Sequence, residues 1–142
     1  MLTVIDGPFI EAGESLSSAI DVTAGALVRI TMPSEWTEAP ITFQFSTDGT
    51  YFNEMCNLEG YAITIQNIWP GSGVIVPEHV GRAVAHIKFR SGTAGNPVPQ
   101  EAGRLFAVAI IDSGDASAPA AMKFKPKKTR LPTKKKAAKK KR

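Results

Sequence analysis

Residues 41–55, ITFQFSTDGTYFNEM, decide the fold class. Ile41, Phe43 and Phe45 alternate with polar residues, which is the pattern of a β-strand with one buried face. Asp48 and Gly49 follow, and an Asp-Gly pair beside such a run is the strongest short-range signal for a β-hairpin. Residues 51–58 are therefore expected to return as the partner strand. The stretch predicts antiparallel pairing through a type I′ turn in which Gly49 takes a positive φ.

Short apolar runs separated by Gly and Pro fill the rest of residues 1–111. The strongest is RLFAVAII at residues 104–111, and its nearly continuous apolar character predicts a strand near the centre of a sheet. ALVRITM at residues 26–32 alternates, which places Val28, Ile30 and Met32 on one face. A turn or a single helical turn is expected at residues 78–81. Further strands are expected at residues 2–5, 15–23, 61–68, 74–76 and 83–90.

These patterns predict an all-β protein. About eight strands at intervals of roughly ten residues, without a segment of helical period, favour an antiparallel β-sandwich of the jelly-roll kind. Residues 1–111 are expected to form this domain, and residues 112–122, rich in Ala, Ser and Gly, a linker. No apolar run approaches the roughly 20 residues needed to span a bilayer.

Charge divides the chain into two parts. Residues 1–122 carry five basic and thirteen acidic residues, a formal charge of −8, whereas residues 123–142 carry twelve basic residues and no acidic one. We call residues 123–142 the basic tail. Its only apolar residues larger than Ala are Phe124 and Leu131. It cannot bury enough surface to fold alone, so we expect it to be disordered or extended.

The chemistry of the basic tail is phosphate neutralisation. Side chains of Lys and Arg bind phosphates without regard to base sequence, and the tail holds no placed Asn or Gln to contact base edges. We expect nonspecific binding of DNA or RNA, while a polyanionic protein surface or an anionic membrane remains an alternative. The candidate nucleic-acid-binding residues are Lys123, Lys125, Lys127, Lys128, Arg130, Lys134, Lys135, Lys136, Lys139, Lys140, Lys141 and Arg142.

The sequence offers little material for catalysis or metal binding. His79 and His86 are the only histidines, Cys56 is the only cysteine, and no cluster of these residues has ligand spacing. Phosphate-loop, nucleophile-elbow and zinc-protease motifs are missing as well. We expect no catalytic residue, no metal site and no cofactor. Cys56 is expected to be a small buried apolar residue.

Three further residues are candidates for a ligand or an interface. Trp36 and Trp69 both fall in predicted loops, and together they could form a stacking platform for a sugar. The alternative is that such tryptophans plug the end of the core or lie at a subunit interface. Asp48 could bind a cation or a sugar hydroxyl, but its position before Gly49 favours a structural role in the turn.

Several motifs occur in a recognisable order: LVRITMPSEW, ITFQFSTDGTYFNEM, HIKFRSGT, and then Gln100 and Arg104. This order resembles the small β-sandwich structural proteins of tailed bacteriophages and gene-transfer-agent particles, with a Trp loop, a strand ending in S-x-D-G-x-x-F and an I-K-x-R-S-G strand. The S-x-D-G-x-x-F piece is also similar to discoidin-like and galactose-binding-like jelly rolls. The resemblance covers residues 15–111 and implies a fold class and a virion-structural setting. It brings no catalytic residues, and the basic tail lies outside its pattern.

Two functions are therefore expected. The first is a non-enzymatic virion component, such as a capsid decoration, neck or tail protein, made in the cytoplasm of a bacterial host. It would dock in multiple copies on other virion proteins while the basic tail contacts nucleic acid or an acidic surface. The second is a carbohydrate-binding module for surface or host attachment, with the tail as an electrostatic anchor. An enzyme is the least favoured class.

Overall fold

The computed structural model describes residues 1–112. The basic tail and the predicted linker beyond Asp112 lie outside the described residues. The described part contains eight strands and one helical turn: β1 Leu2–Ile10, β2 Ile20–Asp21, β3 Gly25–Thr31, β4 Ile41–Ser46, β5 Asn53–Glu54, β6 Gly73–Ile75, α1 Glu78–Gly81, β7 His86–Ser91 and β8 Arg104–Asp112. Within this part, no helix is long and apolar enough to cross a membrane.

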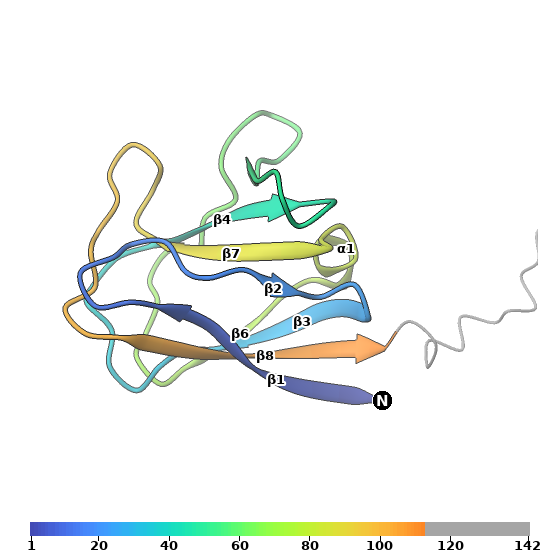
Figure 1. Cartoon of the computed structure of the whole chain (residues 1–142), viewed down its shortest axis with the longest axis horizontal. Helices are drawn as coiled ribbons and strands as arrows, with labels where there is room; N and C mark the ends of the chain where they lie inside the picture. The colour runs from blue at the N-terminus through green and yellow to red at the C-terminus, as the bar shows by residue number, and fades with distance from the viewer. Residues whose placement is uncertain (113–142) are drawn as a thin grey trace, which may run out of the picture.

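The strands form two antiparallel four-stranded sheets that face each other (Figure 1). The first sheet has the order β1-β8-β3-β6 and the second the order β2-β7-β4-β5. Every connection except the one between β4 and β5 crosses from one sheet to the other, which is the interleaved connectivity of a jelly roll. The all-β, antiparallel β-sandwich predicted from the sequence is confirmed.

The core lies between the sheets and is held by a chain of aromatic rings. Phe89 on β7 packs edge-to-face against Phe43 on β4 and against Phe106 on β8, with ring centroids 5.3 and 5.1 Å apart. Trp36 continues the chain with its ring centroid 5.6 Å from that of Phe106. Edge-to-face pairs of this kind add about 1 kcal/mol beyond the apolar area that they bury. The aromatic chain therefore ties one sheet to the other.

β8 occupies an inner position of its sheet, as the apolar run at residues 104–111 predicts. It pairs with β1 on one side and with β3 on the other. Phe106, Val108 and Ile110 are buried in the core. The alternate residues of β8 lie on the other face of the sheet, where Leu105 is exposed and Ala109 is buried.

The strict alternation predicted for residues 26–32 is wrong. Leu27 pairs with Ile110 and Arg29 with Ala109, so Val28 is an extra residue in a β-bulge. The bulge places both Leu27 and Ile30 in the core, although they lie three residues apart. The short strand predicted at residues 2–5 is longer in the structure, since β1 continues to Ile10. A second bulge shifts its register between Asp6 and Phe9, where the peptide bond before Pro8 is cis.

Three other predicted strands are mostly irregular. Only Ile20–Asp21 of residues 15–23 and only Asn53–Glu54 of residues 51–58 form strands. No strand forms at residues 61–68, although Ile65 makes an isolated bridge with Ile41. The carboxamide oxygen of Asn57 accepts hydrogen bonds from the backbone of Glu59 and Tyr61, at 3.1 and 3.0 Å, and turns the chain back. This side-chain turn competes with a regular ladder.

The two ends of the sandwich differ in what they carry (Figure 1). We call the end with α1 and the last described residue, Asp112, the exit end, because the chain continues from there toward the basic tail. The opposite end, the loop end, holds the connections at residues 11–19, 32–40 and 92–103 and the last part of the connection at residues 55–72, whose first part lies beside α1. Candidate residues lie at both ends.

Candidate functional site

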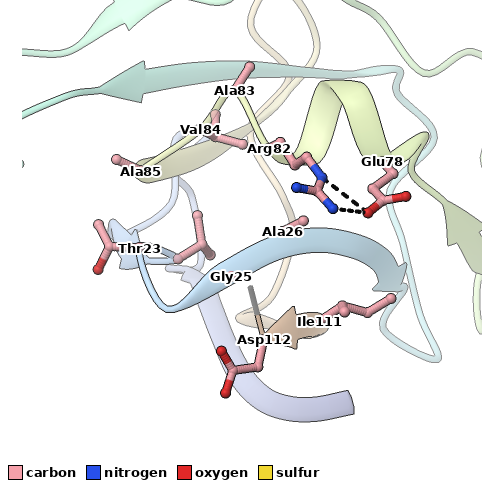
Figure 2. Close-up of a pocket in the computed structure, with 11 residues that line it drawn as sticks. Thr23, Gly25, Ala26, Glu78, Arg82, Ala83, Val84, Ala85, Ile111 and Asp112 are labelled. Carbon is pink, nitrogen blue, oxygen red and sulfur yellow. Dashed lines mark hydrogen bonds and ion pairs between the residues drawn. The ribbon is translucent and has the colours of Figure 1, made fainter. Parts of the chain in front are cut away.

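At the exit end, the described chain finishes beside a depression of about 380 Å³ (Figure 2). Small residues line its floor, among them Gly25 and Ala26 of β3 and Ala83 and Ala85 before β7. Gly25 is required there, because a Cβ atom would lie only 2.0 Å from the carbonyl oxygen of Ile111. The close approach of β3 to β8 therefore shapes the exit end.

The charged groups of this depression do not favour an anion. Arg82 is the only basic residue that lines it, and its Nε donates to Glu78 at 3.0 Å (Figure 2). Both side chains are about half exposed, so this i,i+4 pair stabilises the fold little. Glu78 and Asp112 add two carboxylates to the lining. Phosphate neutralisation at this end would have to come from residues beyond Asp112.

Two other basic residues of the described part, Arg90 and Lys88, are also engaged. Arg90 is buried and forms a two-pronged pair with Glu54, with both nitrogen–oxygen distances at 2.6 Å. The hydrogen bond from Arg90 lowers the pKa of Glu54, and the same bond raises the pKa of Arg90. The Nζ atom of Lys88 lies 4.3 Å from the centre of the Phe52 ring. In total, residues 1–112 carry five basic residues and twelve acidic ones, a formal charge of −7.

The loop end carries acidic residues over a buried polar network. Gln100 is completely buried; its Nε2 donates to Ser91 Oγ at 2.6 Å, and its Oε1 accepts from Arg104 Nε at 3.0 Å. Arg104 also approaches Glu35 at 3.6 Å. The exposed acidic residues of this end are Glu11, Glu14, Glu35, Glu38 and Glu101. In the sequence, only the Gln100 and Arg104 pair of the resemblance points to this network. The sequence does not reveal that Gln100 joins the loops.

The two tryptophans lie at the loop end but in different environments. Trp36 is only 9% exposed, and its Nε1 donates to the carbonyl oxygen of Ala39 at 3.1 Å. Its ring packs in the core, so it presents no surface for a sugar. Trp69 is 73% exposed, and its loop meets the Trp36 loop where Gly71 N donates to Pro33 O at 2.7 Å. The structure brings the loops together but does not create a shared aromatic platform.

Asp48 lies in a loop longer than the predicted type I′ turn. Phe45 pairs with Asn53, so seven residues separate these partners instead of two. Asp48 Oδ1 accepts hydrogen bonds from the backbone of Tyr51 at 3.0 Å and of Thr50 at 2.8 Å, and from Ser46 Oγ at 2.9 Å. These bonds lower the pKa of Asp48 to about 2. Gly49 has a φ of +80°, as predicted, and the carboxylate serves to organise the loop.

The remaining candidates are dispersed. Cys56 is exposed, contrary to the prediction that it is buried, because it lies beyond the end of β5, in the irregular segment that leads into the Asn57 turn. His79 is exposed at α1 and His86 is half-buried under Gly49. Among residues 1–112, no three His, Cys, Asp or Glu side chains gather closely enough to hold a metal ion. The twelve candidate nucleic-acid-binding residues lie outside the described residues.

Comparisons of the chain with protein-family models, with curated proteins and with solved structures gave no match. The fold, the distribution of charge and the chemistry of the residues themselves are the features that point to a function. A jelly roll alone does not identify a function, because unrelated activities use the same fold.

Proposed function

We propose that the chain is a non-enzymatic structural component of a virus-like particle. In this proposal the jelly-roll body docks on other structural proteins, and the basic tail makes nonspecific contacts with packaged nucleic acid. The observation that carries it is the division of charge. The described body has a formal charge of −7 and its arginines at positions 82, 90 and 104 lie beside carboxylates, whereas the basic tail has twelve positive charges.

This division supports a tether. An acidic body is repelled by nucleic acid and so stays off it, whereas a polycationic segment attached to the body is attracted. The chain leaves the body from Asp112 at the exit end, away from the connections at residues 11–19, 32–40 and 92–103 of the loop end (Figure 1). The loop end and the outer sheet faces therefore stay available for protein contacts while the tail is bound.

The proposal predicts the salt dependence of DNA binding. If six to ten tail charges contact phosphates, the logarithm of the binding constant should fall against the logarithm of salt concentration with a slope of about −5 to −9. Fluorescence anisotropy with a labelled duplex measures this slope for the full chain. A variant that ends at Ala121 should lose binding, and a full-length variant with the tail residues in scrambled order should keep it.

Two results would overturn the proposal. One is DNA binding that survives truncation or does not respond to salt, because the tail would then not be the contact. The other is a mass-spectrometric inventory of purified particles from the producing organism that lacks the chain. The carbohydrate-binding alternative now depends on Trp69 alone of the two tryptophans, and a glycan array with the Trp69→Ala variant tests it.

A further inference from the structure

The edges of the two sheets are unequal. Three of the four edge strands are short: β2 and β5 have two residues each and β6 has three. Short edge strands are one way in which proteins avoid pairing with other chains. β1 is the exception, since its nine residues run along the open edge of the first sheet.

The two halves of β1 differ in how they are protected. In the second half, the bulge and Pro8 interrupt the strand, and the backbone of Phe9 is already bonded to Ser18. Residues 2–6 contain no Pro, Lys or bulge, and they pair with β8 on one side only. On the other side, no residue of the described part hydrogen-bonds to their backbone. This half of β1 is an unprotected edge.

The side chains of this half suit a protein surface rather than water. Leu2 is 49% exposed and Val4 is 55% exposed, and both face outward, opposite Ile111 and Ala109 of β8. Exposed apolar residues on a long, unprotected edge strand favour pairing with a further strand.

The sequence of residues 2–6 is complementary to itself. In antiparallel pairing about a two-fold axis at Val4, the two Val4 side chains lie opposite each other, Thr3 meets the partner's Ile5 and Leu2 meets the partner's Asp6. Asp6 is the only charged residue of the five. The two Asp6 carboxylates would lie about 14 Å apart at roughly 3.4 Å per residue, beyond the screening length at physiological salt. No like charges are opposed.

We propose that two copies of this chain pair antiparallel through residues 2–6 of β1 and join their first sheets into one eight-stranded sheet. The contact is isologous and closes on itself, so it gives a dimer and not a filament. The pairing depends on the body alone and does not rest on the proposed function of the tail.

The test compares two single charge changes on the same outer sheet face of the full-length chain. Val4→Lys places two ammonium groups directly opposite each other in the proposed pairing, which is destabilising. Ile75→Lys makes the same change on β6, where the side chain is 76% exposed and remote from the β1 edge in strand order. In sedimentation equilibrium we expect dimers for the unchanged chain and for Ile75→Lys, and a dimer dissociation constant raised at least about tenfold for Val4→Lys.

Salt and crosslinking separate this contact from other associations. A dimer held by the basic tail on an acidic body would dissociate at high salt, whereas the strand pair should persist. In a Cys56→Ser background, Val4→Cys should give a covalent dimer with a short bismaleimide crosslinker, and Ile75→Cys should not. A monomeric unchanged chain, equal effects of the two lysine changes, dissociation by salt or equal crosslinking at both positions would each overturn the proposal.

Discussion

The side chain of Gln100 and the backbone of Thr37 form a closed pair of hydrogen bonds across 63 residues of sequence. Thr37 N donates to Gln100 Oε1 at 2.9 Å, and Gln100 Nε2 donates to Thr37 O at 3.0 Å. The backbone of Gln100 also bonds to Gly13 and Glu14, at 2.8 and 3.0 Å. One buried glutamine thus replaces a strand pairing where no strand exists, and it fixes three connections of the loop end to each other.

We expect Gln100→Ala to lower the free energy of unfolding by about 3 kcal/mol or more, because it leaves several buried donors and acceptors unpaired and opens a cavity. Chemical denaturation followed by circular dichroism measures the change. Gln66→Ala is the matched control: Gln66 is exposed, so its loss should cost less than about 0.5 kcal/mol. Equal losses for the two variants would contradict the role assigned to Gln100.

The Arg90–Glu54 pair predicts a stability that depends on pH. Arg90 lowers the pKa of Glu54 in the folded protein, so the stabilisation is complete above the carboxyl's ordinary pKa of 4.5 and is lost as pH falls through the lower folded value. Glu54→Gln should therefore cost about 1 kcal/mol near neutral pH, a modest value because Glu54 is 36% exposed. The difference from the unchanged chain should close in strong acid.

Urea denaturation at a series of pH values checks this prediction. Glu59→Gln is the control, because Glu59 is an exposed glutamate, and it should cost little at any pH. A cost for Glu54→Gln that stays constant down to strong acid would show that the charge of Glu54 is not what stabilises the pair.

The sequence predicts those parts of the fold in which local pattern and tertiary position agree. The alternation at residues 41–46 and the apolar run of β8 both became strands in the expected places. The bulges at Val28 and near Pro8 could not be predicted, because they depend on the register with β8 and not on local pattern. The alternation at residues 61–68 failed because the Asn57 turn competes with a ladder.

The candidate site divides in the same way. Charge is a property of composition, so the contrast between an acidic body and the basic tail is visible in the sequence. Burial is not, and the two loop tryptophans look equivalent in sequence although one is in the core and the other is exposed. Gln100 looks like an ordinary loop residue, since only the folded chain brings Thr37 and Ser91 to it.

The different environments of the tryptophans give a direct prediction. Trp36→Ala should lower the free energy of unfolding by about 3–5 kcal/mol, because it removes a large side chain that packs on Phe106. Trp69→Ala should change it by less than about 0.5 kcal/mol. Acrylamide quenching supplies a second readout: in Trp69→Phe only the buried Trp36 emits, and its fluorescence should be quenched less than that of the exposed Trp69 in Trp36→Phe. Similar quenching in both would contradict these positions.

The Asp48 loop predicts a titration well below the ordinary range. Backbone donors at Tyr51 and Thr50 and the hydroxyl of Ser46 lower the pKa of Asp48 to about 2. Because this value is below the ordinary 3.8, the stabilisation from the carboxylate is complete above pH 3.8 and is lost as pH falls toward 2. The carboxyl carbon shift of Asp48, followed by NMR, should titrate with a midpoint near 2. Ser46→Ala removes one donor and should raise that midpoint, since fewer hydrogen bonds then favour the charged form. A midpoint near 3.8 in the unchanged chain would show that the loop does not hold the Asp48 carboxylate as described. A low midpoint that moves upward in Ser46→Ala would show that the hydrogen bonds to Asp48 organise the connection between β4 and β5.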